Sequence, residues 1–394
     1  MERPGDFAVG RVTDLIASPT IAVGKRAREL REQGVDVVDF GPGEPDFVTP
    51  VHIRDAAVEA IQAGMTHYAP GRGLPKLRAA IARKLARENA VQYDPDTEIV
   101  VTPGAKQAIV EAILTAVAPS DEVIMFDPCW GSYDAIVRLA EGHPVHVQLR
   151  PDFSIDSELL EANLSSRTRA IIVGSPGNPT GHVLGREELD MLAEVCIRHD
   201  LLLVSDEIYE RITYGDVTPI SPASLPGMWE RTVTINGLSK AYAMTGWRLG
   251  YAAAPKSFTE QLLKIQEHTV TAATSFAQAG AVAALDGPRE PIDAMVHEFG
   301  RRREIMVEGL NRIPGVRCLP PDGAFYAFPD VSSTGLSGTE LADMLLGHGV
   351  ALTPGAGFGE TWDTHVRLSY ATSEERIRTG LERMHEALSF VLSR

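Results

Sequence analysis

The chain has 394 residues, of which 44% are hydrophobic and 23% are charged, so it can bury a sizeable core and wholesale disorder is excluded. Its 37 lysines and arginines against 53 aspartates and glutamates give a formal net charge of −16, which disfavours a nucleic-acid or anionic-membrane partner. The three cysteines lack disulfide or metal-site spacing and no apolar run is long enough to span a membrane, so we expect a cytoplasmic protein without a metal site.

Short apolar runs alternate with helical patterns through the middle of the chain. The runs that we predict to be strands are 98–103, 122–128, 144–149, 170–176, 201–207, 232–237 and 249–255. The helical patterns between them are 105–118, 186–199 and 257–268. Continuous apolar runs are typical of strands buried on both faces, and their alternation with helices predicts a mostly parallel α/β sheet covered by helices.

The pattern changes after the turn signal Gly287-Pro288. The later part has helical patterns at 297–312, 338–347 and 373–392, around AFYAFPDV and HVRLSYA, which we predict to be antiparallel strands. We therefore predict a large α/β domain over 45–287 and a smaller α+β domain made of 1–44 and 288–394.

Ligands of open α/β sheets bind beyond the carboxyl ends of the strands. The residues at those ends are Gly104-Ala105-Lys106, Pro128-Cys129-Trp130, 175–178, 206–209 and Ser239-Lys240. They offer an amine, an acid, an amide, a phenol, an indole and a helix start that contains glycine. This set suits a planar, phosphorylated cofactor that contains nitrogen.

Lys240 lies in the stretch GLSKAYAMTGWRLG, residues 237–250. Apolar neighbours and the nearby Arg248 would lower the pKa of its amine, as a Schiff-base-forming lysine requires. An isolated lysine is more often a surface residue, but this whole stretch resembles the lysine signature of class I pyridoxal-phosphate (PLP) aminotransferases. The motifs GEPDF, SPxNPTG, SDEIYE, AMTGWR and VRLSYAT also occur in this order from Gly43 to Thr372. They are similar to those of the aspartate aminotransferase family, in its bacterial I-gamma-like subgroup.

The resemblance implies the PLP-dependent transferase fold (fold type I) and an aminotransferase of amino-acid metabolism. Such an enzyme moves the amino group of an L-amino acid to a 2-oxo acid, in a ping-pong reaction through pyridoxamine phosphate. Lys240 is then the catalytic residue, which holds PLP and later acts as general base.

The resemblance also implies how the cofactor ring is held. Asp206 faces the pyridine nitrogen, Tyr209 and Asn178 donate to the phenolic oxygen, and Trp130 stacks on the ring. Taken alone, these residues have ordinary alternatives: a helix N-cap for Asp206, a turn amide for Asn178, and core aromatic residues for the other two.

The phosphate of PLP suits the helix start at Gly104, Ala105 and Lys106, where free backbone N–H groups and the helix dipole attract anions. By the same resemblance Arg248 adds a cation and Ser239 a hydroxyl. Tyr68 aligns with a tyrosine that reaches the phosphate of the neighbouring subunit, which predicts a homodimer with shared active sites. The alternative for Tyr68 is a plain loop tyrosine.

The resemblance implies that Arg367 binds the substrate α-carboxylate, because its planar fork suits bidentate binding. A backbone N–H of Gly43 is expected at the same carboxylate, and Trp130 and Asn178 also border the substrate. The alternatives are an arginine in a strand salt bridge and a simple turn glycine.

The substrate side chain is less well defined. Aspartate-specific members of the subgroup carry a lysine where the alignment places Ile16, so we expect aspartate to be a poor donor compared with a neutral or basic amino acid. Aspartate aminotransferase proper and a PLP-dependent lyase or oxidase on the same fold are alternatives, as is a non-catalytic PLP-binding regulator. A nicotinamide dehydrogenase is disfavoured because no strand is followed by GxGxxG.

Overall fold

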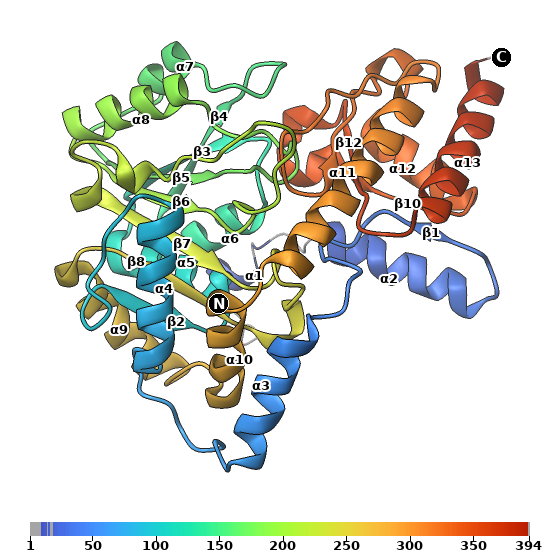
Figure 1. Cartoon of the computed structure of the whole chain (residues 1–394). Coiled ribbons are helices and arrows are strands. Elements are labelled where there is room, and N and C mark those ends of the chain that lie inside the picture. The colour runs from blue at the N-terminus through green and yellow to red at the C-terminus, as the bar shows by residue number, and fades with distance from the viewer. Residues whose placement is uncertain (1–8, 14, 16–18, 393–394) are drawn as a thin grey trace, which may run out of the picture.

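The computed structural model describes residues 9–13, 15 and 19–392. A seven-stranded sheet forms the centre of what we call the larger body, with the strand order β2-β8-β7-β6-β5-β3-β4 (Figure 1). Its strands are β2 (Ile99–Thr102), β3 (Glu122–Asp127), β4 (His143–Gln148), β5 (Thr168–Gly174), β6 (Leu202–Asp206), β7 (Thr232–Gly237) and β8 (Gly250–Ala253). Only β8 runs antiparallel to its neighbours, so the predicted mostly parallel sheet is confirmed.

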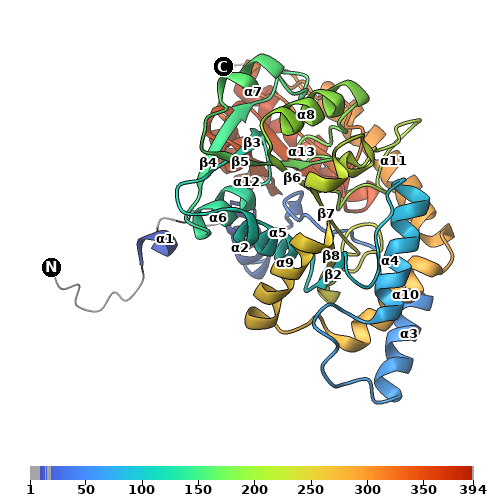
Figure 2. The same cartoon turned by 90° about the vertical axis from the view of Figure 1, so that its left-hand side faces the viewer.

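Helices cover both faces of this sheet. The helices of the larger body are α3 (Val51–Gln62), α4 (Pro75–Glu88), α5 (Ala105–Ala116), α6 (Ser132–Leu139), α7 (Ser157–Ala162), α8 (Arg186–Arg198), α9 (Lys256–Thr269) and α10 (Ser275–Asp286). Figure 2 shows α7 and α8 on one face and α5, α6 and α9 on the other. Successive strand residues point to opposite faces, so Met125 packs with Ile109 of α5, whereas Ile124 packs with Leu189 of α8.

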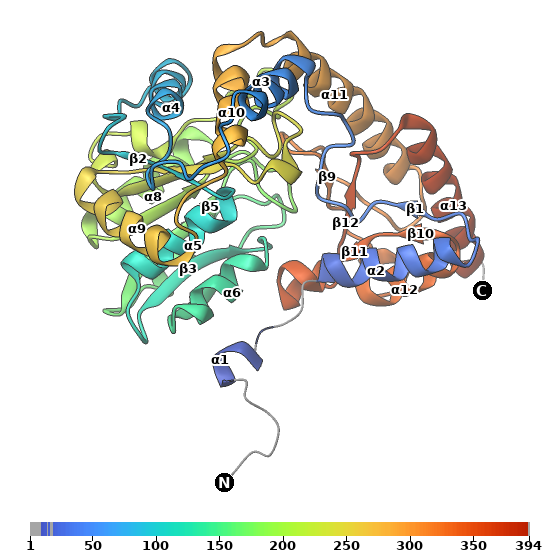
Figure 3. The same cartoon turned by 90° about the horizontal axis from the view of Figure 1, so that it is seen from below.

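The smaller body lies beside the larger one (Figure 3). Its helices and strands are α2 (Pro19–Glu32), β1 (Val38–Asp39), β9 (Tyr326–Ala327), α12 (Gly338–Gly347), β10 (Val350–Ala351), β11 (Thr353–Pro354), β12 (Val366–Ser369) and α13 (Glu374–Leu392). β12 pairs antiparallel with both β9 and β11, as predicted for the two late strands. β1 pairs parallel with β10, which joins an early segment of the chain to a late one in this body.

A few short helices complete the described part. They are α1 (Gly10–Thr13), η1 (Pro222–Ser224), η2 (Trp229–Arg231), η3 (Thr245–Trp247), η4 (Ser332–Thr334), η5 (Gly355–Phe358) and η6 (Glu360–Trp362). Within the described ranges, no helix combines the length and the hydrophobicity that crossing a lipid bilayer requires.

Helix α11 (Glu290–Asn311) connects the two bodies as one continuous element. Its Ile292 packs in a hydrophobic cluster of the larger body, whereas Phe299 and Met306 pack in the main cluster of the smaller body. The helix thus begins seven residues before the predicted 297–312 pattern. Because it belongs to both bodies, the predicted domain boundary at residue 287 stays a prediction.

Candidate active site

The carboxyl ends of the parallel strands open onto a cavity of about 360 Å³ between the two bodies. The predicted site residues that line it are Gly43, Ala105, Lys106, Trp130, Asn178, Asp206, Tyr209, Ser239, Lys240, Arg248 and Arg367. Gly104 lies against this set, because a Cβ on it would come 2.6 Å from Nη2 of Arg248. Tyr68 is not part of the cavity wall and is 90% exposed.

Lys240 lies on the turn after β7, and its side chain is half-buried. Burial lowers the pKa of its amine to about 8, so about a tenth of the amine is uncharged at pH 7, far more than for an ordinary lysine, and can act as a nucleophile. Its Nζ donates to the carbonyl oxygen of Gly43, whereas the expected contact of the Gly43 N–H with a substrate carboxylate stays a prediction. A glycine is needed at residue 43 because a Cβ would lie 2.8 Å from the Tyr326 hydroxyl.

Asp206 is the last residue of β6 and is buried. Its Oδ2 accepts from the hydroxyl of Tyr133 at 2.8 Å and its Oδ1 accepts from the N–H of Ile208 at 3.3 Å. Burial raises the pKa of Asp206 to about 6, and these two donors oppose the rise. The carboxyl is therefore mostly ionised at neutral pH and suits a protonated ring nitrogen.

Two tyrosine hydroxyls meet at the cavity wall. The hydroxyls of Tyr209, after β6, and Tyr326, on β9, lie 2.7 Å apart. Burial raises the pKa of both phenols, so both keep their protons and can donate to an oxyanion. Sequence reasoning missed both Tyr133 and Tyr326.

Arg367 on β12 is only 2% exposed. Its Nη1 donates to Asn178 Oδ1 at 3.1 Å and its Nη2 donates to the carbonyl of Gly41 at 2.6 Å. Its Nε has no hydrogen-bond partner, and no carboxylate of the described residues forms an ion pair with this guanidinium. A buried cation without a counter-ion is costly, so this position favours an anionic ligand such as a carboxylate.

The start of α5 offers a second anion site. Gly104 has φ +90° and precedes Ala105, the first helical residue, so the backbone N–H groups of the first turn are free for a ligand. A Cβ on Gly250 would lie 2.3 Å from the backbone nitrogen of Ala105, so glycine is required for this close approach. The guanidinium of Arg248 adds a fixed cation, since its Nη1 donates to the carbonyl of Thr245 at 2.9 Å.

These groups fit PLP. A buried carboxylate suits the ring nitrogen, the paired hydroxyls suit the phenolic oxygen, and the helix start with its arginine suits the phosphate. The Lys240 amine, with its lowered pKa, suits the aldehyde carbon. The Nε–H of Arg367, which has no hydrogen-bond partner, can donate to a substrate carboxylate.

Lys106 supplies a further cation in the cavity. Its Nζ lies 4.6 Å from the centroid of the Trp130 indole, and that ring packs edge-on against Tyr133, 5.4 Å between centroids. Burial, together with the charge of Arg248, lowers the pKa of this lysine. Within the described ranges no carboxylate forms an ion pair with it, so it is available to an acidic ligand.

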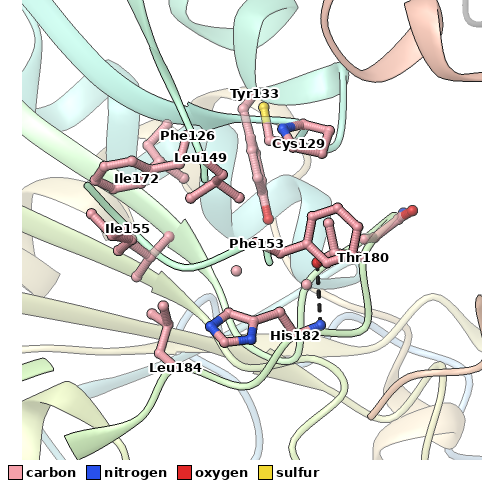
Figure 4. A pocket seen from close by; sticks show the side chains of 15 residues that line it. Phe126, Cys129, Tyr133, Leu149, Phe153, Ile155, Ile172, Thr180, His182 and Leu184 are labelled. Carbon is pink, nitrogen blue, oxygen red and sulfur yellow. Dashed lines mark hydrogen bonds between the residues drawn. The ribbon is translucent and has the colours of Figure 1, made fainter. Parts of the chain in front are cut away.

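A smaller cavity of about 50 Å³, drawn in Figure 4, adjoins the main one. The two cavities share Tyr133, Gly174 and Asn178. Figure 4 shows His182 on the far side of the smaller cavity. His182 Nε2 lies 3.0 Å from Glu188 and its Nδ1 lies 3.7 Å from Asp322. Although burial lowers the pKa of His182, these carboxylates raise it to about 9, so the imidazole is charged at neutral pH.

Ile16, on which the expectation about aspartate depends, lies outside the described residues. The described residues therefore do not test that expectation.

Comparisons with known proteins identify the family of this chain. The family profile "Aminotransferase class I and II" matches residues 35–384. The chain is 44% identical to an aspartate aminotransferase of Geobacillus stearothermophilus, covering 95% of this chain and 97% of that protein. It is 42% identical to a probable aspartate/prephenate aminotransferase of Aquifex aeolicus, covering 96% and 98%. Among solved structures, the aspartate aminotransferase from Thermus thermophilus with maleate has a TM-score of 0.93 at 41% identity, covering 97% of this chain and all of that one.

Proposed function

Because the chain belongs to the class I and II aminotransferases, which use PLP to move an amino group from an amino acid to a 2-oxo acid, we propose that its preferred donor is aspartate or a similar dicarboxylic amino acid. The observation that carries the proposal is the pair of cations Lys106 and Arg367 in one cavity, neither with a carboxylate partner among the described residues. An acidic amino acid has two carboxylates and can engage both. This proposal departs from the expectation based on Ile16, because the cavity holds another cation.

The relatives support an acidic donor. The Geobacillus protein is named an aspartate aminotransferase, and the Thermus enzyme was solved with maleate, which is a dicarboxylate. A four-carbon dicarboxylate of this kind has the same pair of charged ends as aspartate.

We propose the following roles for the residues of the cavity. Bound PLP supplies an electron sink that stabilises negative charge at the substrate Cα. Arg367 binds the α-carboxylate and, because Asn178 and the Gly41 carbonyl fix its guanidinium, orients the Cα–H bond. The Lys240 amine would hold the cofactor and, once free, would act as the general base that takes the proton from Cα.

Asp206 keeps the ring nitrogen protonated, and Tyr133 stabilises the charged form of Asp206. Tyr209 and Asn178 hold the phenolic oxygen. The N–H groups at the start of α5 hold the phosphate together with Arg248 and Ser239.

We also propose a homodimer. Tyr68 follows α3, on which Val51, Val58 and Ile61 are exposed at a spacing that places them on one face of the helix. A second copy of the chain would cover this face and bring Tyr68 toward the partner's phosphate site. Sedimentation tests the proposal, since a monomer with full activity would contradict it.

The two-domain division at residue 287 and a cytoplasmic location complete the proposal. The first is supported by the hydrophobic clusters, because one consists mostly of residues of the smaller body and another lies wholly in the larger body. The second is supported by the three cysteines, all of which are free.

The experiment for the donor is Lys106→Met, with kcat/KM measured for aspartate and for alanine. Loss of a charged hydrogen bond costs ~1.5–3 kcal/mol, so kcat/KM for aspartate should fall about ten- to a hundredfold. The value for alanine should change little, because alanine has no side-chain carboxylate. The dissociation constant of PLP is measured alongside, since a loss that follows cofactor affinity would assign Lys106 to the phosphate. A parent enzyme that prefers alanine to aspartate would refute the acidic donor and leave the aminotransferase assignment intact.

A further inference from the structure

The turn after β6 has two sides. Asp206 and Tyr209 line the cavity. Glu207 and Glu210 are not part of the cavity wall, and both carboxylates contact the C-terminal end of α4. Because Tyr209 lies between these two glutamates in the chain and Asp206 directly precedes them, whatever holds the glutamates also holds the two cavity residues.

Asn89, the C-cap residue of α4, joins the two glutamates. Its Nδ2 donates to Glu207 Oε2 at 3.0 Å and to Glu210 Oε2 at 2.7 Å. Its Oδ1 accepts from Lys84 Nζ at 2.8 Å. The amide orientation is fixed by charge, since its carbonyl faces an ammonium and its NH₂ group faces two carboxylates.

On the side of the turn that faces α4, the two carboxylates of Glu207 and Glu210 have one lysine ammonium, that of Lys84, in contact. Lys84 is only 2% exposed and also donates to Glu210, whereas Glu207 accepts only from neutral donors. These include the hydroxyls of Ser205 at 3.1 Å and Ser221 at 2.7 Å. Glu207 is buried, Glu210 is half-buried, and only Glu210 contacts the ammonium. Neighbouring carboxylates repel each other, so the NH₂ group of the asparagine is needed to keep them together.

Helix α4 does not depend on this network for its own packing. Leu77, Ile81 and Leu85 are fully buried in a hydrophobic cluster of the larger body. The helix is held in place by the burial of its apolar side chains. The hydrogen-bond network therefore fixes the turn after β6 against a helix that is already in place.

We propose that Asn89 is a positioning residue that sets the place of the Asp206 carboxylate and the Tyr209 hydroxyl from outside the cavity. The inference rests on the cofactor roles proposed above for these two residues. Asn89 touches neither substrate nor cofactor, and it acts through Glu207 and Glu210.

The test is Asn89→Ala, with PLP binding to the apoenzyme measured by quenching of protein fluorescence. We expect the dissociation constant of PLP to rise about tenfold and the pH midpoint of the absorption change of bound PLP to shift. We expect kcat to fall and the donor KM to stay close to that of the parent, because Arg367 does not contact the network. The matched control is Asn163→Ala, which removes another helix C-cap asparagine whose Nδ2 donates to the Leu159 carbonyl at 2.8 Å. This control should leave PLP affinity unchanged.

A second variant separates positioning from general loss of stability. In Asn89→Ala/Glu210→Gln the new amide can donate to Glu207 in place of the missing one, so PLP affinity should partly recover. This double variant also removes one of the buried charges, so it serves where Asn89→Ala alone does not fold. A lower Tm of Asn89→Ala with unchanged PLP affinity and unchanged absorption midpoint would overturn the inference.

Asp206→Asn distinguishes failure of this inference from failure of the proposed site. If Asp206→Asn weakens PLP binding but Asn89→Ala changes neither the PLP affinity nor the absorption midpoint, only the positioning role of Asn89 is refuted. Unchanged PLP binding by Asp206→Asn would refute the cofactor role on which the inference rests.

Discussion

Replacing Arg367 by lysine keeps the positive charge but removes the planar fork. Arginine has five N–H donors, and here one goes to the Gly41 carbonyl and one to Asn178. Three donors remain, among them the Nε–H group that has no partner within the described ranges. These suffice for a bidentate contact with a carboxylate. A lysine has three donors in all, and after the same two bonds it has one left for the substrate.

The substitution therefore costs at least one charged hydrogen bond to the α-carboxylate. Such a bond is worth ~1.5–3 kcal/mol, which corresponds to about a ten- to hundredfold fall in kcat/KM. Every amino acid carries the same α-carboxylate, so the loss in Arg367→Lys should be equal for acidic, neutral and aromatic donors. The described contacts of Arg367 are hydrogen bonds to Gly41 and Asn178 and ring contacts with Tyr326 and Phe358. None of them is with the phosphate end of the cavity, so PLP should still bind.

The assay is steady-state kcat/KM over a panel of donors, with Arg78→Lys as the control. Arg78 is also a buried arginine, its Nε donates to the Gly73 carbonyl at 3.2 Å, and it lies outside the cavity. The control should leave every kcat/KM unchanged. An unaltered kcat/KM in Arg367→Lys, or a loss confined to acidic donors, would refute the assignment of Arg367 to the α-carboxylate.

Two further predictions concern residues around the cavity. Tyr133→Phe removes the hydroxyl 2.8 Å from Asp206 Oδ2, so kcat should fall about tenfold. The control is Tyr93→Phe, which should leave kcat unchanged; Tyr93 is 6% exposed and Tyr133 is 5% exposed. Equal kcat values for the two variants would contradict the role of the hydroxyl. The pKa of His182 is about 9, above its ordinary value of 6.5, so its contribution to stability is complete below pH 6.5 and is lost as the pH rises through 9. Urea unfolding at about pH 6 and about pH 10 should show a smaller fall in unfolding free energy for His182→Gln than for the parent, and equal falls would show that the charged imidazole does not stabilise the fold.

The sequence predicted most of the sheet and much of the cavity wall for the same physical reason. Buried strands read as continuous apolar runs, and parallel strands end at a common edge, so the residues after each run meet in space. Asp206 and Lys240 both follow this rule, after β6 and β7. The predicted helix over 338–347 coincides with α12, because the Ser337 and Glu340 side chains cap it reciprocally.

The residues that sequence reasoning missed depend on contacts between distant parts of the chain. Tyr326 reaches Tyr209 only because β9 of the smaller body lies near the carboxyl end of β6 in the larger sheet. No local sequence pattern predicts this contact. The sequence around Asn89 is that of an ordinary helix end, and its partners Glu207 and Glu210 lie more than a hundred residues away. Tyr133 could have been suspected from the sequence, since it lies three residues after Trp130 and close to the carboxyl end of a predicted strand, where ligands of such sheets bind.

The pairing of β1 with β10 has a consequence for the nascent chain. A ribosome releases Val38 early, but its partner Val350 is made only when most of the chain has emerged. All strands of the large sheet are complete once residue 253 has been made, so the larger body can begin to fold during translation. The cavity is therefore built in order, with the wall that carries Lys240 forming first and the wall that carries Gly43 and Arg367 closing near the end of synthesis.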